Sequence, residues 1–500
     1  MIHRKRIRWL CGCCALSVLM MSAWAKSHSD PASFISTTRE RITLTIYDQD
    51  FALVSEHRPL SLQTGLNEVM LLSISPHLDA QSLLLLWDKA SALRPEVLAS
   101  TYDLGIQNKA TLLQRYIGKT VQVIRYGQDG KPATVLQGIL LSADETGLVL
   151  QGVEASYMGS ARPDMEGIHV NPEGTLLLPK EAGISVLPAL RLQLQAPAVG
   201  DAILQLGYLT SGLDWDADYI ATLQRGDTMR LECWATVTNQ TGLAFPNATV
   251  SLVAGAPSPF RAQTMVEYGR EINLMFGAPP APGGAPARLV PQPLGELYSY
   301  PIRAPVSIAD SQQSRLMLHE ALQVPVKRRY TYRAPTLGAA GVSFVGKEPF
   351  RGSVEVALIF ENRKEHGLGL PLPQGSVRIY EIDRAGVPRY LGAADLPATP
   401  ANRKVTLSFG RTFDLVGEWQ PLRQTTPRRG IARYEVQITL SNSKDQPVEV
   451  QVIQPFNGSW RILEASQPHE RLSATAAQWW VKVPAGGTTR LRFTAEVRAL

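Results

Sequence analysis

The sequence is poor in cysteine, and three of its four cysteines lie within the first 25 residues. Beyond them only Cys233 remains, and a single cysteine cannot form an intrachain disulfide. This excludes the small extracellular scaffolds that disulfides hold together. Cys233 shares one face of an expected strand with Leu231 and Ala235, so we expect it to be buried and unreactive.

Long apolar runs are also missing, since no segment reaches the roughly 20 apolar residues that a membrane-spanning helix needs. One shorter apolar stretch, Trp9 to Met21, follows four basic residues and precedes Ser22-Ala23-Trp24-Ala25. This layout is typical of a secretory signal peptide with its cleavage site. We therefore expect residues 1–25 to be removed, leaving an exported chain, periplasmic or extracellular, with no transmembrane segment.

The chain lacks a strong excess of one charge. It has 50 basic and 44 acidic residues, and four of the basic ones lie within residues 1–25. The expected mature chain therefore carries 46 basic against 44 acidic residues, a net charge of +2. A chain of this length with so small a net charge has no general attraction for nucleic acid, so we expect no nucleic-acid partner.

Recognisable catalytic motifs are absent as well. The histidines beyond the leader are scattered, without the paired spacing of a metal site. No Gly-x-Ser-x-Gly sequence marks a serine hydrolase. Gly118-Lys119-Thr120 is similar to the end of a phosphate-binding loop, but Leu113 stands where that loop needs a glycine. The sequence thus predicts no cofactor, no metal centre and no catalytic residue, and it favours a protein that is not an enzyme.

What the chain has is strict alternation of apolar and polar residues. The pattern is clearest in four segments, 191–195, 231–237, 433–440 and 490–498. Side chains alternate between the two faces of a strand, so each segment buries one face and leaves the other in water. Burial of one face and exposure of the other is typical of antiparallel sheets. We predict a mainly β protein built of antiparallel β-sandwich domains.

The composition suggests three regions after the leader. We expect an N-terminal β region at 26–117, a small β-barrel-like module at 118–190 and a large β-sandwich region at 191–500. A Pro/Gly-rich loop is expected near 277–293, because proline removes donors from a strand ladder.

One short helix is expected around Gln107–Ile117. Apolar residues repeat there at helical spacing, and Gly118 is placed to end the helix. The repeating residues are Ile106, Ala110, Leu113 and Ile117.

The local cluster best suited to bind a ligand or to carry out chemistry is Asp214, Asp216 and Asp218. The alternation places all three on one strand face, opposite Leu213, Trp215, Ala217 and Tyr219. Three carboxylates could bind a hard cation such as Ca²⁺, supply an acid/base pair or form a hydrated acidic face. Same-face neighbours lie roughly 6.6 Å apart on a strand, too far for all three to reach one ion unless the strand bends.

Several motifs together resemble a known family. They are Thr45-Ile46-Tyr47-Asp48-Gln49-Asp50-Phe51-Ala52-Leu53-Val54, Gly65-Leu66-Asn67, Leu209 through Tyr219, Phe360-Glu361-Asn362, Leu368 through Gly375, Tyr380-Glu381 and Tyr390-Leu391-Gly392. With these motifs the chain resembles the bacterial exported family of unknown function that includes the mucoidy-inhibitor-A-like proteins. The resemblance implies an exported β-rich protein without an established reaction, and it adds no catalytic residue. The long coiled-coil segment of mucoidy-inhibitor-A-like members has no counterpart here.

These observations favour a non-catalytic exported envelope protein that acts as a binding or structural β-domain module. Its partner would be an envelope protein or a surface polymer. Two alternatives remain open: a hydrolase of envelope glycans or peptides that uses Asp214, Asp216 or Asp218, and a structural module stabilised by a divalent cation on the same face.

Overall fold

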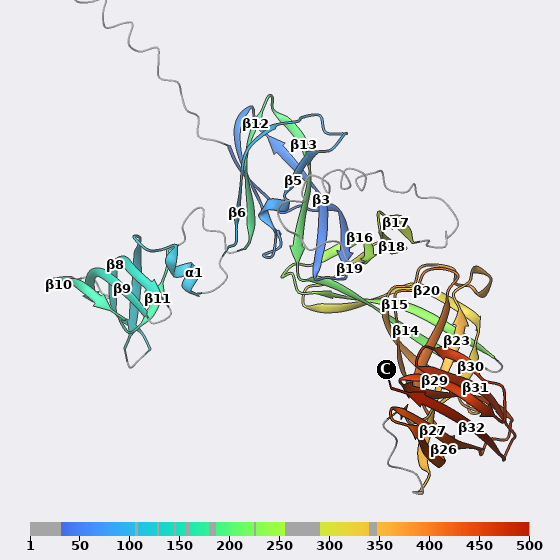
Figure 1. Ribbon diagram of the computed structural model, residues 1–500. Coiled ribbons are helices and arrows are strands. Elements are labelled where there is room, and N and C mark those ends of the chain that lie inside the picture. The colour runs from blue at the N-terminus through green and yellow to red at the C-terminus, as the bar shows by residue number, and fades with distance from the viewer. Residues whose placement is uncertain are drawn as a thin grey trace, which may run out of the picture. The chain divides into compact units, whose positions relative to one another are not determined.

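The computed structural model describes residues 32–105, 109–127, 130–144, 147–156, 160–179, 187–224, 227–255, 291–339 and 348–499 (Figure 1). Strands make up most of these residues, with one short α-helix, so the mainly β fold that the alternation predicts is confirmed. The leader expected at 1–25 and most of the loop expected near 277–293 lie outside the described residues. Residues at the end of that loop form a short strand, β17 (Gln292–Leu294), whose edge position accommodates Pro293.

The chain divides into two compact units that are not continuous in sequence. Among the described residues, the first comprises those up to Glu40, those in His57–Pro76 and those in Leu84–Leu206. The second comprises those in Arg41–Glu56, in His77–Leu83 and from Gly207 onward. Two of the boundaries between these units fall inside long strands, β3 (Phe51–Leu62) and β13 (Gly200–Ser211).

The first unit contains a four-stranded sheet and, separately, a five-stranded one. The four-stranded sheet has the order β1-β4-β12-β6, with bounds Ala32–Ser36, Gly65–Leu71, Ala189–Ala196 and Glu96–Asp103. Apolar residues of β12 alternate inward, as 191–195 predicts, and Leu192 and Leu194 are buried. A short strand, β5 (Leu84–Trp87), also belongs to this unit.

The five-stranded sheet has the order β10-β9-β8-β7-β11. Its bounds are Ser160–Val170, Gly147–Ser156, Pro132–Asp144, Thr120–Tyr126 and Thr175–Leu177. One helix, α1 (Lys109–Gln114), adds Leu113 to the core of this sheet. The helix is shorter than the expected Gln107–Ile117, whose first two residues lie outside the described part of the chain. After Gln114 the backbone tightens into turns, so Tyr116 is buried and Ile117 is exposed.

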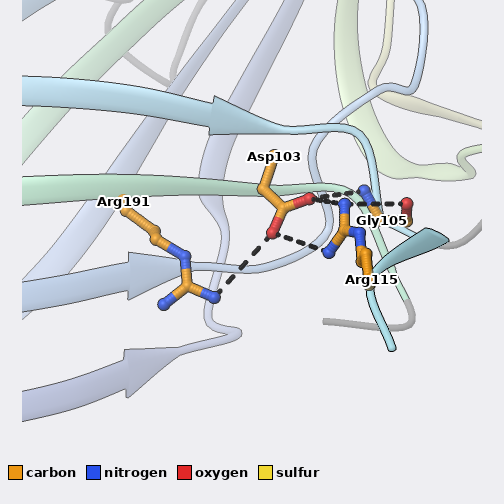
Figure 2. Close-up of polar contacts among 4 residues, drawn as sticks. All are labelled: Asp103, Gly105, Arg115 and Arg191. Atoms are coloured by element: carbon orange, nitrogen blue, oxygen red, sulfur yellow. Dashed lines mark hydrogen bonds and ion pairs between the residues drawn. The ribbon is translucent and has the colours of Figure 1, made fainter. Parts of the chain in front are cut away.

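A group of polar contacts around Asp103 connects the end of β6 to the residues that follow α1 (Figure 2). Arg115 donates from Nη1 and Nη2 to the two carboxylate oxygens of Asp103, at 3.2 and 2.5 Å, and also donates to the carbonyl of Gly105. Arg191 lies 3.8 Å from the same carboxylate. Burial raises the pKa of Asp103, but hydrogen bonds from Arg115 and the Gly105 amide outweigh burial and lower it. Asp103 is therefore ionised at neutral pH and fixes the chain entering α1.

The second unit contains a mixed set of strands around β16 (Phe245–Ala254). Their order is β17-β18-β16-β2, and β19 also pairs with β16. Strand β18 spans Leu297–Pro301, β2 spans Glu40–Tyr47 and β19 spans Val306–Ile308. A short 3-10 helix, η1 (Ala80–Ser82), also belongs to this unit. Strand β2 runs parallel to β16, pairing Leu44 with Val250. Residues far apart in sequence are therefore neighbours in this sheet.

A five-stranded sheet of the second unit carries the aspartate cluster. Its order is β20-β15-β14-β24-β25, with bounds Gln312–Pro325, Thr228–Asn239, Leu213–Leu223, Gly375–Ile382 and Pro388–Leu396. Strands β14 and β15 alternate buried and accessible residues over almost their whole length, as the sequence predicts. We call this sheet the central sheet.

The C-terminal part of the second unit is a ten-stranded sheet with the order β29-β32-β27-β26-β23-β21-β28-β31-β30, in which β22 also pairs with β28. It curls into two layers, since Trp479 of β31 stacks on Phe493 of β32 and Phe456 of β28 stacks on Trp460 of β29. In the order β29, β32, β27, β26, β23, β21, β28, β31 and β30, the strands span Ser459–Ala465, Thr488–Arg498, Ile431–Asn442, Lys404–Arg428, Phe350–Glu361, Lys327–Arg333, Val448–Asn457, Ala476–Val483 and Glu470–Ser473. Strand β22 spans Leu337–Gly338. A short 3-10 helix, η2 (Lys364–His366), follows β23.

Candidate functional site

The buried face of β14 is structural. Leu213, Trp215, Ala217 and Tyr219 are all buried, as the alternation predicts. The Trp215 indole donates to the carbonyl of Val253 at 3.1 Å, and the Tyr219 hydroxyl donates to the carbonyl of Pro373 at 2.7 Å. The aromatic residues of this motif therefore anchor the central sheet to its neighbours, and each buried polar atom has a partner.

Cys233 lies on the same buried face, opposite Tyr219 in the ladder. Burial, the largest influence, raises the pKa of its thiol to about 12. A thiol with that pKa is protonated at neutral pH and is a poor nucleophile. The expectation of a buried, unreactive cysteine agrees with this geometry.

The opposite face of the central sheet gathers charged side chains around Asp218. Arg315 of β20 forms a short ion pair with Oδ1 of Asp218, and Arg378 of β24 lies 3.5 Å from the same oxygen. Thr236 of β15 donates to Oδ2 at 3.0 Å. Both oxygens of this carboxylate are engaged by neighbouring strands, so Asp218 acts as the centre of a cross-strand network.

These side chains line an open hollow of about 970 Å³ in the central sheet. Asp216 and Asp218 come from β14, Ser376, Arg378 and Tyr380 from β24, Gln313 and Arg315 from β20, Thr236 from β15 and Asp395 from β25. The lining offers both donors and acceptors and includes a tyrosine. We call this hollow the polar groove.

Arg315 also packs against an aromatic ring beside the groove. Its guanidinium carbon lies 4.8 Å from the centre of the Trp234 ring, which is the β15 neighbour of Asp218. A guanidinium held by a carboxylate on one side and a ring on the other loses little further freedom when a ligand binds. The groove is thus partly ordered in advance.

Asp214 has a different role from the other two aspartates. Its Oδ1 accepts hydrogen bonds from the Trp215 amide at 2.9 Å and from the Asp50 amide at 3.3 Å. In return, Asp50 accepts from the amide of Gly212 at 3.1 Å. Asp50 and Gly212 both have positive φ angles, so this exchange fixes two tight turns. Asp214 does not line the polar groove.

Asp216 is the least satisfied of the three carboxylates. Burial raises its pKa, and the charges of Asp214 and Asp218 raise it further. Asp48 is affected in the same way, mainly by burial and then by Asp214 and Asp216, although the Gly255 amide lowers its pKa. Asp48 and Asp216 therefore bind protons more tightly than isolated aspartates, because burial and, to a smaller extent, neighbouring negative charges oppose their ionisation.

The sequence places Asp214, Asp216 and Asp218 on one face of β14, and in the structure only the last two line the groove. It gives no sign of Arg315, Arg378 or Thr236, because pairing between distant strands brings them to Asp218. The available signal is weak: alternation marks these residues as solvent-facing but does not identify their neighbours.

The described part of the chain was searched for clustered metal ligands and for membrane-spanning helices. Within it, no group of three or more His, Cys, Asp or Glu side chains has a geometry that could hold a metal ion. The helices that the structure describes include none with the length and hydropathy to cross a bilayer.

The comparison with known families adds one match. Residues 204–499 match the domain of unknown function DUF4139, which covers more than half of the chain, including the central sheet and the C-terminal ten-stranded sheet. No curated protein matches the chain. The matched region contains the Gly212–Tyr219 motif, which makes both the aromatic anchor and the aspartate side of the polar groove. The chain is therefore a member of the DUF4139 family.

Proposed function

We propose that this protein is a non-catalytic exported envelope protein that binds a hydroxyl-rich glycan chain in the polar groove of its DUF4139 domain. The observation that carries the proposal is the groove itself, an open hollow of about 970 Å³ lined by carboxylates, guanidiniums, hydroxyls and amides from five strands. Export is supported by the leader-like residues 1–25. The motifs of the sequence also support a relationship to the bacterial mucoidy-inhibitor-A-like proteins.

The chemistry of the groove suits a sugar chain. Carboxylate and guanidinium groups form paired hydrogen bonds with neighbouring hydroxyls, and tyrosine offers an apolar ring with a polar tip. Tyr380 lines the groove and packs edge-on against Tyr390, with ring centres 5.6 Å apart. An open hollow accommodates a section of a polymer that continues beyond it at both ends.

The contacts of the Asp218 carboxylate support a binding role over a catalytic one. A general acid must hold a proton that it can donate, whereas Asp218 is paired with Arg315 and Arg378 and accepts a hydrogen bond from Thr236. In this arrangement both oxygens of Asp218 are occupied as acceptors of contacts from neighbouring strands.

Binding can be tested with the full chain on an array of neutral and acidic envelope glycans, followed by calorimetry with the best oligosaccharide. Replacing Arg378 with alanine removes a groove donor, and we expect a 10- to 100-fold loss of affinity, equivalent to about 1.5–3 kcal/mol. The matched control is Arg389→Ala on β25, where the arginine is exposed and pairs with Asp383 outside the groove. Equal affinity of the two variants, with matched thermal midpoints, would overturn the proposal.

One observation favours a second candidate, a glycan hydrolase. The raised pKa of Asp216 is a property of general acids, and Asp216 lies in the groove beside Asp218. The same oligosaccharide, incubated with the protein and analysed by chromatography, separates the two candidates. Cleavage that Asp216→Asn abolishes while binding persists would establish the hydrolase and reject the non-catalytic role.

Export can be tested independently. We expect the chain recovered from the envelope fraction to begin near Lys26. An intact N-terminus in a cytoplasmic fraction would contradict this part of the proposal.

A further inference from the structure

The C-terminal ten-stranded sheet has one face packed on the core and one face in water. Four consecutive strands, β29, β32, β27 and the second half of β26, carry arginines on the water face. Cross-strand partners share a face, and the ladder pairs Arg433 and Arg461 with Glu496 and pairs Arg423 with Glu435. The six arginines are Arg423, Arg433, Arg461, Arg490, Arg492 and Arg498. We call this surface the arginine face.

The arginine face is strongly positive even after its acids are counted. The same strands present Glu418, Glu435, Glu464 and Glu496, and Arg351 of β23 pairs with Glu418 at 2.9 Å. Seven arginines, counting Arg351, therefore stand against four glutamates, an excess of three positive charges. The chain outside the leader has a net charge of only +2, so this concentration on one sheet face is local.

Glu496 holds three of the arginines in place. Its side chain is only 3% exposed, and it lies 2.8 Å from Arg433 Nε, 2.9 Å from Arg498 Nη2 and 3.7 Å from Arg461 Nη2. One carboxylate cannot neutralise three guanidiniums. Because each guanidinium has five N–H donors, the group remains cationic and keeps donors available for an outside anion.

The remaining arginines are less occupied. Arg492 donates to the neutral amide oxygen of Gln437 at 2.7 Å, and within the described chain Arg490 and Arg423 have no carboxylate within ion-pair distance. Arg490 and Arg492 point the same way, two residues apart on β32, which separates them by roughly 6.8 Å. The result is a spaced row of cations on a twisted surface.

We propose that the arginine face binds a linear acidic polysaccharide through its regularly spaced carboxylate, sulfate or phosphate groups. Arginine binds each of these anions with two parallel hydrogen bonds, and a row of arginines repeats that contact along a chain. Many outward residues between the arginines are polar, such as Thr425, Gln437 and Thr439, and these four strand segments carry no outward tryptophan or tyrosine of the kind that anchors a protein in a lipid interface. The apolar exceptions are Leu422 and Leu463, which are each 39% exposed, and Phe413 in the first half of β26, which is fully exposed. This composition favours a polymer over a membrane.

The test uses the full chain with polygalacturonate and heparin as acidic glycans and dextran as the neutral glycan. The variant Arg490→Gln with Arg492→Gln removes two cations that have no carboxylate partner, so folding is expected to be unaffected. We expect a 10- to 100-fold loss of affinity for at least one acidic glycan. We also expect the affinity of the unmodified chain to fall steeply between about 50 and 200 mM salt, because several ionic contacts are lost together.

The matched control is Arg328→Gln with Arg389→Gln, which removes the same charge from exposed sites on β21 and β25, off the arginine face. If this control variant loses as much acidic-glycan affinity as Arg490→Gln with Arg492→Gln, the loss follows from net charge alone, and the proposal is overturned. Equal binding of dextran by a chain whose polar groove is disabled by Arg378→Ala would also overturn it, as would tighter binding to phosphatidylglycerol vesicles or duplex DNA. The loss caused by Arg490→Gln with Arg492→Gln should persist in a chain whose polar groove is also disabled by Arg378→Ala, which separates this proposal from the one for the polar groove.

Discussion

Three aspartates that look equivalent in the sequence have three different environments. Asp214 accepts backbone hydrogen bonds and fixes a turn, Asp218 is paired with two arginines, and Asp216 is partly buried with a carboxylate on either side along the strand. The difference comes from the surroundings: arginines of two neighbouring strands pair with Asp218, whereas Asp216 is partly buried between two carboxylates of its own strand.

At the residue scale, Asp216→Asn is expected to raise the thermal midpoint at neutral pH. The pKa of Asp216 in the folded protein lies above its ordinary value of 3.8. Such a group stabilises the fold below its unfolded pKa and loses that contribution as the pH rises through the folded pKa. The gain from Asn should therefore shrink as the pH falls through the folded pKa, and it should be smallest below about 4, near the unfolded pKa.

Calorimetry over a pH series measures this effect, with Asp445→Asn in an exposed turn as the control for removal of one negative charge. A lower midpoint for Asp216→Asn at neutral pH would mean that its carboxylate makes a favourable contact instead.

At the element scale, the strands follow from alternation, and their close packing depends on a few glycines. Strand β26 contains two instructive ones. A Cβ atom at Gly417 would lie 2.2 Å from the ring of Tyr332, whereas at Gly410 the nearest atom would be the Leu391 carbonyl oxygen at 3.9 Å. Tyr332 is fully buried and belongs to the core of the sandwich.

Gly417→Ala is therefore expected to destabilise the protein by about 1–3 kcal/mol, because the ring has no space to move in a packed core. Gly410→Ala in the same strand is the matched control and should have little effect. Urea denaturation measures both, and an equal change in the two variants would contradict the packing argument.

At the scale of the whole molecule, the second unit is assembled from separate parts of the chain. Segments Arg41–Glu56 and His77–Leu83 belong to it, but both precede the family match at 204–499. Strand β2 supplies the parallel partner of β16, and Asp50 supplies half of the exchange with Gly212 and Asp214.

A fragment of residues 204–499 alone is thus expected to melt at a lower temperature than the second unit in the full chain. Without β2, one edge of β16 has unpaired backbone groups, and its amides should exchange hydrogen faster. Circular dichroism and hydrogen exchange measure these changes. Equal midpoints and equal protection of β16 would contradict the assignment of β2 to this unit.

Much of the fold could be predicted, and much of the candidate site could not. Alternation in 231–237 and 433–440 identifies strands β15 and β27 and their buried faces, because burial of every second side chain is a local property. The helix was predicted too long, since the chain tightens into turns before the apolar spacing ends. Arg315 and Arg378 were not identified, because their meeting with Asp218 depends on strand order.

The sequence by itself determined the strand-rich character of the protein, the inert burial of Cys233 and the two faces of β14, since each follows from side-chain polarity at alternate positions. Only the tertiary structure decided which aspartate is paired and which is not, and which arginines gather on one surface. Those outcomes depend on pairing between residues as distant as Asp218 and Arg378, and a backbone hydrogen-bond ladder has no sequence code of its own for its partner.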